Sequence, residues 1–528
     1  MKKFYKNFEL YKAVEIFLIC SFILIVAGPF LILIFKLLDA LFKGNNIDYT
    51  LFFPSGKRFT LFLRSANLSF ITSFSDMLAG FFTALFLWQY KKIKSYKYLL
   101  FVFITIPNYV HVLAWTNTFN DINQIFQFFN FDSIILSGNL ITCFVQFMAY
   151  YPITTALCLL GLELIPVEYI ESAKLYKKDS AILFKIITPL AFPFIIAGGI
   201  FIFLITIMDY TIPSLYQINV YSMEIFADYS TYSDGVRAFQ LSVPLIVLAT
   251  FVIFTFKKYL KAIDVESFKI KQCDINFKLP LPIYIVQCIS VILFILQIIV
   301  PLFQLFSLAI KENFVQNVIE SINELKYTFL VSIIAALVAV ILSFVVAEYM
   351  NKGSKILWIL NIVPFVIPAS LSGIGIIMIY NRSILGAVYG SSLMSILATC
   401  ARFIPFSVLI LTFMFKQEDK VLIDAANIYK KSEFMSLVKI KIPLFIKSIL
   451  ASFVFVFVFS AQELGASLMV VPPGKGTITM KIYNYMHYGA TGKVASLCLF
   501  MTIISLVCGA VILYALRNYN KVKSEDNF

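Results

Sequence analysis

The sequence is poor in charged residues and in the side chains that most often carry catalysis. Only 14% of its 528 residues are charged, whereas about a quarter is usual in soluble proteins. The chain has two histidines, and its eight cysteines form no CxxC pair. The low charge excludes a soluble globular protein. The other shortages leave a His-based catalytic triad, a zinc site and a disulfide framework without support.

Apolar side chains are abundant instead. Hydrophobic residues make up 60% of the chain, the mean hydropathy is +0.88, and there are 56 phenylalanines. Apolar runs of about twenty residues are typical of membrane-spanning helices, whereas membrane barrels alternate over about ten residues. The runs long enough to span are 13–38, 66–89, 98–119, 136–161, 190–210, 238–257, 281–309, 326–347, 356–380, 388–415, 444–464 and 494–516. The sequence therefore predicts an all-α polytopic membrane protein with about 12 transmembrane helices.

The basic residues indicate how these spans are oriented. The net charge of +14 comes from short Lys and Arg clusters that recur in alternate loops between the apolar runs. Since cytoplasmic loops are enriched in basic residues, we expect these loops and both termini to be cytoplasmic. Such dispersed clusters do not indicate a nucleic-acid partner. The N-terminal apolar run is too long for a signal peptide and is expected to be a retained span.

Two halves of the chain repeat the same order of residues. Five pairs stand 253 to 257 positions apart, namely Pro107 and Pro364, Pro152 and Pro405, Glu171 and Asp424, Pro189 and Pro443, and Asp209 and Glu463. Five pairs in one order at nearly one offset indicate an internal duplication. We expect a first repeat at 1–260, a cytoplasmic linker at 261–280 and a second repeat at 281–528. Because both repeats begin on the same side, the two six-helix repeats are predicted to be parallel and pseudo-symmetric.

Two of the predicted cytoplasmic loops share a motif. Residues 165–193 read IPVEYIESAKLYKKDSAILFKIITPLAFP, and residues 418–446 read EDKVLIDAANIYKKSEFMSLVKIKIPLFI. In each loop an acidic residue and two small residues precede a Tyr-Lys-Lys turn. Ser180 or Ser432 follows as a candidate N-cap of a second short helix, and a proline then begins the next span. The pattern predicts a helix–turn–helix on the cytoplasmic surface, present twice.

These loops resemble the EAA loop of the membrane subunits of ATP-binding-cassette importers, within residues 163–190 and 416–443. In that family the first short helix docks in a groove on the ATPase subunit and transmits its movement. The resemblance assigns ATPase coupling to Glu171, Ser172, Ala173, Lys177, Pro189, Asp424, Ala425, Ala426, Lys430 and Pro443. The family's glycine falls on Lys177 and Lys430, and glycine adopts a positive φ more readily than lysine does.

Three further segments resemble the fused, two-half permeases of the ferric-iron importer type. They are PNYVHVLAW (107–115), ARFIPF (401–406) and ELGASLMVVPPGKGTITMKIYNYMHYG (463–489). The resemblance implies a type I ABC importer permease in a bacterial inner membrane. Its implied partners are two ATPase copies and a periplasmic or extracellular solute-binding protein, besides membrane lipid. Ferric iron is the expected cargo, with thiamine or phosphonate as alternatives. An ion-coupled secondary transporter is the alternative from another class.

No cofactor is expected to bind this chain directly, and no enzyme activity is expected of it. The phosphate-binding patterns GxxxxGKS and GxxxxGKT are absent. The segment PGKGT at 473–477 has a different spacing and falls on the predicted external side. ATP is therefore expected to be hydrolysed by the partner subunits.

Four charged residues in or beside the spans are candidates for a translocation pathway. Asp209 and Glu463 each lie 20 residues after a loop proline, which places them at matching points near the external mouth if each helix is continuous. They are expected to attract or relay a cation, or else to be hydrated helix ends or contacts to the binding protein. Arg402 and Asp76 fall inside spans, where a pathway or gate role and an interspan salt bridge are both open.

Overall fold

The chain folds almost entirely into helices in the computed structural model. The structure describes residues 2–43, 48–90, 102, 104–132, 137–261, 278–417 and 433–525. No strand occurs among these residues. Together with the long apolar helices set out below, this confirms the prediction of an all-α polytopic membrane protein.

The helices follow one another with short connections. Up to residue 261 they are α1 (Lys2–Phe22), η1 (Ile23–Ala27), α2 (Gly28–Phe42), η2 (Tyr49–Phe52), α3 (Lys57–Gln89), α5 (Asn108–Phe128), α6 (Asn139–Glu163), α7 (Val167–Lys174), α8 (Asp179–Ile182), η4 (Leu183–Ile187), α9 (Thr188–Met208), α10 (Thr211–Leu215), α11 (Tyr221–Tyr232), α12 (Gly235–Thr255) and α13 (Lys257–Lys261). After residue 277 they are α14 (Leu281–Ile310), α15 (Phe314–Ile319), α16 (Ile322–Asn351), α17 (Lys355–Ile362), η6 (Val363–Val366), α18 (Ala369–Tyr380), η7 (Ser383–Leu385), α19 (Gly386–Tyr389), α20 (Leu393–Gln417), α22 (Glu433–Ser436), η8 (Leu437–Lys441), α23 (Ile442–Ala461), α24 (Ser467–Val470), α25 (Ile478–His487) and α26 (Thr491–Glu525).

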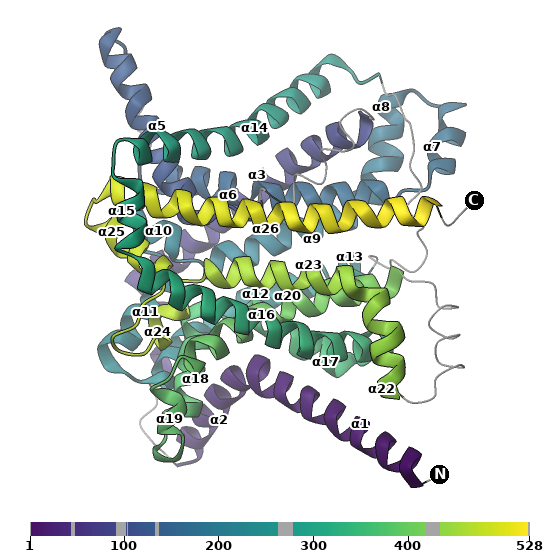
Figure 1. Cartoon of the computed structure of the whole chain (residues 1–528). Coiled ribbons are helices and arrows are strands. Elements are labelled where there is room, and N and C mark those ends of the chain that lie inside the picture. The colour runs from purple at the N-terminus through teal and green to yellow at the C-terminus, as the bar shows by residue number, and fades with distance from the viewer. Residues whose placement is uncertain are drawn as a thin grey trace.

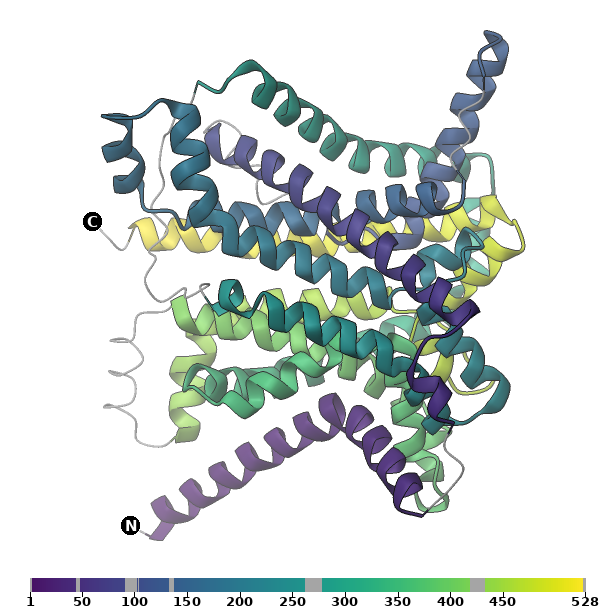
Figure 2. The same ribbon diagram turned by 180° about the vertical axis from the view of Figure 1, so that it is seen from behind.

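Ten helical stretches among the described residues are long and apolar enough to cross a membrane. The number becomes eleven if α17, η6 and α18, which are bent by 113° at their junction, count as one span. The long helices run in a common direction, and the N- and C-termini lie at the same end of the bundle (Figures 1 and 2). The described part of the chain therefore has fewer candidate spans than the twelve that the sequence predicts.

The predicted span at 356–380 is broken rather than continuous. Pro364 has no N–H to donate to a helix, and Ile367 is extended, with φ −115° and ψ 130°. An extended conformation is favoured for Ile367 because the ring of Pro368 disfavours a helical residue before it. Two prolines four positions apart thus divide an apolar run that hydropathy alone reads as one helix.

The predicted span at 98–119 also differs. Residues 98–101 and 103 lie outside the described residues, and the described helix, α5, begins only at Asn108, after the extended Pro107. The helix then continues to Phe128 through a segment rich in Asn, Asp and Gln. This polar second half is why α5 is not among the candidate spans.

Three long helices pack closely in each half of the chain. They are α3, α6 and α9 before residue 261, and α16, α20 and α23 after residue 277. Small residues permit the close approach, as is usual between membrane helices. A Cβ at Gly161 of α6 would lie 2.6 Å from the Phe194 side chain of α9. In the second group Ala335, Ala336 and Ala339 of α16 are fully buried.

The first helices of the two predicted repeats pack against the opposite group. α1, η1 and α2 contact α16, α20 and α18, whereas α14 contacts α3, α5 and α6 (Figure 1). Phe22 of α1 belongs to the same buried cluster as Ile404 of α20. The Tyr151 hydroxyl of α6 donates to the Ser290 carbonyl of α14 at 2.8 Å. Each group of three helices is therefore completed by a helix from the other half of the chain.

Candidate functional site

Two short helices form a hairpin at the end of the bundle that also holds both termini (Figure 1). We call residues 167–182, which comprise α7, α8 and their turn, the α7–α8 hairpin. α7 begins after Pro166, whose backbone is extended, and α8 begins at Asp179. The turn is closed by the N–H groups of Tyr176 and Lys177, which donate to the Ala173 carbonyl at 3.1 and 2.9 Å. The predicted helix–turn–helix is thus present in the first loop.

The turn differs in two details from the sequence prediction. Lys177 does not have a positive φ, so the turn does not need the glycine that the resembled loop has at this position. Ser180 is not the N-cap of α8, because Lys178 is the extended residue before the helix and Ser180 is the second residue within it. α8 also continues directly into the next span and is not a separate helix.

α7 has one buried side and one exposed side. Ile170 is fully buried in a cluster with Ile182, and Ala173 packs against the edge of that cluster. Glu171 and Ser172 are exposed. Burial of an isoleucine side chain contributes about 1.5–3 kcal/mol, which favours packing of this short helix against the bundle. Glu171 and Ser172 therefore lie where a second subunit can reach them.

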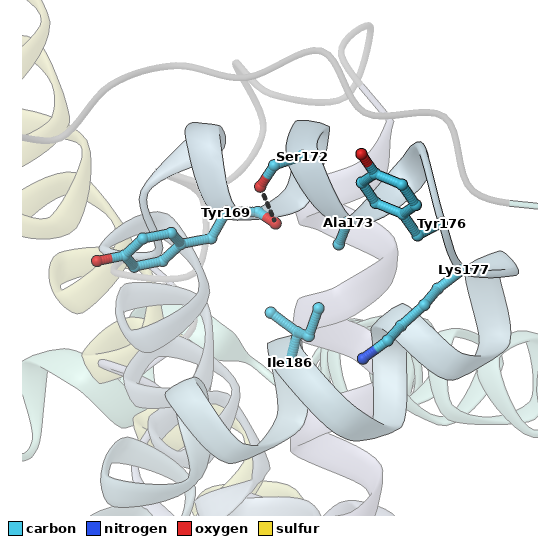
Figure 3. A pocket seen from close by; sticks show the side chains of 6 residues that line it. All are labelled: Tyr169, Ser172, Ala173, Tyr176, Lys177 and Ile186. Carbon is cyan, nitrogen blue, oxygen red and sulfur yellow. Dashed lines mark hydrogen bonds between the residues drawn. The ribbon is translucent and has the colours of Figure 1, made fainter.

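A hollow on the hairpin is lined by side chains from α7, the turn and η4, shown in Figure 3: Tyr169, Ser172, Ala173, Tyr176, Lys177 and Ile186. Tyr169 and Tyr176 project on either side of Ala173, and their side chains are mostly exposed. The Ser172 hydroxyl donates to the Glu168 carbonyl at 2.7 Å and so stays within the helix. Two exposed aromatic rings around an alanine form a surface suited to another helix or loop.

A π-helical turn joins each loop to the following span. η4 lies between α8 and α9, and η8 lies between α22 and α23, 254 positions later. Pro189 and Pro443 are the second residues of α9 and α23. A proline donates no hydrogen bond, and its ring clashes with the carbonyl four residues earlier. The wider π turn accommodates that proline within an otherwise continuous helix.

Most of the second predicted loop lies outside the described residues. This includes four of the assigned residues, namely Asp424, Ala425, Ala426 and Lys430. The fifth, Pro443, occupies the same helical position as Pro189. Lys441 of η8 forms an ion pair with Glu348 of α16, with 2.7 Å between Nζ and Oε1. This largely buried pair fixes η8 to the neighbouring long helix.

At the opposite end of the bundle, Glu463 follows α23 and is held by several donors. It is 4% exposed. One oxygen, Oε1, accepts from Arg402 Nη1 at 2.6 Å and from the Ala466 N–H at 2.8 Å. The other, Oε2, accepts from the N–H and hydroxyl of Ser467 at 2.9 and 2.6 Å. Arg402 thus forms an interspan salt bridge, and Glu463 is not a hydrated helix end.

Asp209 occupies the equivalent place in the first half and has fewer partners. It ends α9, and its Oδ1 accepts from the Thr211 N–H at 2.8 Å at the start of α10. Its Oδ2 is buried and has no hydrogen-bond partner in the described structure. Ala149 stands where the second half has Arg402. The carboxylate of the first half therefore lacks the cation that its counterpart has.

Tyr210 connects the two carboxylate positions. It is 2% exposed, and its hydroxyl donates to the Gly465 carbonyl at 3.3 Å, two residues after Glu463. Asp209, Arg402 and Glu463 all lie near this hydroxyl. We call Asp209, Arg402 and Glu463 the charged cluster. The sequence analysis missed Tyr210, although its position next to Asp209 was a signal that could have drawn attention to it.

Asp76 forms no hydrogen bond or ion pair with the charged cluster within the described structure. It lies in α3 with no exposed surface, and neither carboxylate oxygen has a hydrogen-bond partner within the described structure. The interspan salt bridge that the sequence analysis allowed for Arg402 and Asp76 joins Arg402 to Glu463 and does not include Asp76. The structure therefore brings Arg402 and Glu463 together, and no described residue supplies a countercharge to Asp76.

Aromatic side chains meet between the halves on the hairpin side of the charged cluster. The ring of Phe406 in α20 lies 5.8 Å from that of Phe201 in α9 and 5.6 Å from that of Phe455 in α23, between centroids. Phe365 of η6 adds a third contact to Phe406 at 4.8 Å. The sequence analysis missed this aromatic cluster. Phe201 and Phe455 are 254 positions apart, so the repeat offset was the signal that could have found them.

The comparisons with known proteins give one partial similarity. No family model matches the chain. Over 173 residues it is 26% identical to the spermidine/putrescine transport system permease protein PotC of Escherichia coli K12. The proteins of that name from Escherichia coli O157:H7 and Shigella flexneri match equally. The match covers 33% of this chain and 64% of the relative, so the chain spans less than two thirds of the curated relatives it matches.

Proposed function

We propose that this chain is the membrane-spanning permease subunit of an ATP-driven, binding-protein-dependent importer. The α7–α8 hairpin would dock one ATPase copy, and the second loop at 416–443 would dock another. A solute-binding protein would deliver the cargo at the opposite end, near the charged cluster. The chain contributes a pathway and a coupling surface, and its partners hydrolyse ATP.

The observation that carries this proposal is the continuous helix between the hairpin and the charged cluster. α8, η4 and α9 run without a break over the 30 residues Asp179–Met208, and Asp209 follows directly. At 1.5 Å per residue this helix is about 45 Å long. A displacement of the hairpin by an ATPase would therefore move Asp209 relative to its surroundings.

Other features support the same assignment. The similarity to a transport-system permease supports a transport subunit in a membrane. The matching positions of η4 and η8 support duplicated repeats at 1–260 and 281–528 joined by a linker at 261–280. The hairpin and both termini share one end of the bundle, which supports a cytoplasmic location for all three. The proposed location is the inner membrane of a bacterium.

We propose a positively charged cargo, because the two carboxylates of the charged cluster differ. The Glu463 carboxylate is neutralised by a guanidinium group, whereas Asp209 Oδ2 is buried without a partner. A nitrogen cation or a hydrated metal ion passing between the halves would supply the missing partner for Asp209. Spermidine and putrescine, which appear in the relatives' name, and the ferric iron expected from the sequence resemblance all carry positive charge.

The described residues hold no group of three or more His, Cys, Asp or Glu side chains suited to a metal ion. We therefore propose a transient contact at Asp209 rather than a stable metal site. Uptake of labelled polyamine and of ferric iron by the same reconstituted complex would separate the two cargo classes. The cargo belongs to the class whose labelled member is taken up and whose unlabelled member inhibits any uptake of the other class.

An ion-coupled secondary transporter is the alternative function, and Asp76 is the observation that favours it. A buried carboxyl group within a span is typical of proton or ion relays in such proteins. A transporter of that class would need no ATPase, and the exposed motif residues of the hairpin would have no partner to contact. The two functions therefore differ in whether the hairpin binds a second subunit.

A binding experiment on the hairpin tests the proposed function. The double variant Glu171→Arg plus Asp424→Arg reverses the charge at the acidic position of both loops. We expect it to insert in the membrane normally but to retain much less ATPase in a pull-down than the parent chain. The control is Asp132→Arg, which reverses one exposed acidic charge at the opposite end of the bundle. Equal ATPase recovery with the double variant would contradict the proposed docking site.

A further inference from the structure

The second half of α5 leaves the helix bundle. Figures 1 and 2 both show its end projecting sideways from the bundle, at the end opposite the α7–α8 hairpin. The base of this projection is fixed. Gln304 Nε2 of α14 donates to Asp121 Oδ2 at 2.8 Å, and the hydroxyls of Thr116 and Tyr216 are 2.9 Å apart. The projection is therefore a rigid extension of a buried helix and has its own surface.

Residues 117–132, which we call the α5 arm, have an apolar side and a polar side. Apolar residues recur every three or four positions, at Phe119, Ile122, Ile125, Phe126 and Phe129, which places them on one face of the helix. The opposite face carries amide side chains, at Asn117, Asn120, Asn123, Gln124 and Gln127. No Lys or Arg occurs in the arm.

The arm ends in an ordered turn that gathers phenylalanines at its tip. Asn130 has a φ of 56°, and the Phe131 N–H donates to the Phe126 carbonyl at 2.9 Å. This is the Schellman arrangement of a helix end, and its usual apolar contact is present. The rings of Phe126 and Phe131 are 6.2 Å apart between centroids. Phe128, Phe129 and Phe131 are 82, 62 and 66% exposed.

We infer that the α5 arm lies in the membrane leaflet at this end of the bundle, at the boundary between headgroups and acyl chains. Helices with one apolar side and one polar side favour this boundary, and aromatic rings are enriched there. The neighbouring helix α14 presents Ile299, Phe303 and Phe306 to its surroundings at 55, 66 and 60% exposure. The base of the arm contacts this lipid-facing helix, and the arm projects from the same side of the bundle (Figure 1).

The composition of the arm also indicates how it binds lipid. With no basic residue, the arm gains nothing from anionic headgroups. The burial of the three exposed phenylalanines supplies the binding free energy, and the amide face hydrogen-bonds to headgroups and water. Binding should therefore be no stronger in anionic than in zwitterionic membranes, because the exposed Asp132 near the tip is itself negatively charged. This inference does not depend on the proposed transport function.

Tryptophan fluorescence in lipid nanodiscs tests the inference with the full chain. Phe129→Trp places a probe on the apolar side of the arm, and Gln124→Trp is the matched control on the polar side. Each added signal is the difference from the parent chain, which has three tryptophans of its own. In phosphatidylcholine brominated near the glycerol end of its acyl chains, we expect at least twofold quenching of the signal added by Phe129→Trp. We expect much weaker quenching for Gln124→Trp.

Aqueous iodide should give the reverse order, with stronger quenching at position 124 than at position 129. Equal iodide quenching of both probes and no quenching by the brominated lipid would overturn the inference, because the arm would then lie in water. The inference would also be overturned if the Phe129→Trp fluorescence were not quenched by the brominated lipid but shifted when the solute-binding protein is added. In that case the arm would be a protein contact.

Discussion

The proposed pathway depends on two buried carboxylates, those of Glu463 and Asp209. A buried carboxylate is costly unless hydrogen bonds and a countercharge surround it. Glu463 receives both, from Arg402, Ala466 and Ser467. Asp209 accepts the Thr211 N–H on one oxygen, while the other oxygen is buried without a partner among the described residues. The two halves thus share a carboxylate position but differ in its charge balance.

The first prediction concerns Asp209. Asp209→Asn keeps the size of the side chain and removes its charge. A hydrogen bond to a charged group contributes about 1.5–3 kcal/mol, so we expect uptake of a cationic solute to fall about tenfold or more, with ATPase binding unchanged. Transport assays on proteoliposomes and a pull-down measure the two quantities. Asp132→Asn, which removes an exposed charge at the same end of the bundle, should leave both unchanged.

The second prediction concerns the salt bridge. Arg402→Ala leaves the Glu463 carboxylate buried with its backbone and hydroxyl donors but without its cation. We expect the free energy of unfolding to fall by about 1.5–3 kcal/mol, seen as a lower melting temperature in detergent. The double variant Arg402→Ala plus Glu463→Gln removes the uncompensated charge and should recover part of that loss. A melting temperature of Arg402→Ala equal to that of the parent chain would show that the pair does not stabilise the fold.

Among the helices, the π turns η4 and η8 are the features most directly linked to coupling. Each lies between a loop and a long helix, and one residue separates it from the proline that follows. A π turn holds one residue more than an α turn, so it sets the rotation of everything before it relative to the helix axis. In the first half the segment before it is the α7–α8 hairpin. The angle at which the hairpin meets an ATPase therefore depends on η4.

The third prediction follows from this geometry. Pro189→Ala restores the missing N–H, so η4 can relax to an α-helix, which rotates the hairpin by about 100° around the axis of α9. We expect ATP hydrolysis to continue while the solute transported per ATP falls severalfold. Pro193→Ala, four residues further along the same helix, is the control and should keep the parent ratio. An unchanged ratio for Pro189→Ala would show that the π turn does not set the coupling geometry.

Element boundaries were predictable where local chemistry determines them. Apolar runs gave most long helices, and the loop pattern gave the α7–α8 hairpin, but not that Ile170 and Ala173 form its buried side. The break at Ile367 was harder to predict, because it results from the joint effect of Pro364 and Pro368 within a run that is apolar throughout. The extended arm of α5 was also missed, because hydropathy reports no span where one face of a helix is polar.

At the scale of the whole molecule, the first helix of each half packs against the three-helix group of the other half. This exchange of first helices could not be predicted from the sequence. α1, η1 and α2 and also α14 are strongly apolar, and hydropathy does not say which neighbour such a helix contacts. The ion pair between Arg402 and Glu463 also could not be predicted from the sequence. The two residues are 61 positions apart and on different helices, so only the packing of α20 beside α23 brings them together.

The fourth prediction uses the exchange. If the chain is divided within residues 262–277, the first piece keeps α1 and the second keeps α14. Each piece then exposes a groove that only the other piece can fill, so we expect the two to co-purify when expressed together and to be lost to proteolysis when expressed singly. Membrane levels of each piece, measured with and without its partner, check this. A stable, monodisperse single piece would mean that the exchanged contacts are not needed for folding.

Reconstitution tests the central claim most directly. The full chain is placed in proteoliposomes with the ATPase that it binds and the solute-binding protein that delivers the cargo, and uptake of a labelled cationic solute is measured. The account predicts uptake only when ATP, ATPase and binding protein are all present. Accumulation by the chain alone, driven by an ion gradient and indifferent to ATP, would contradict it.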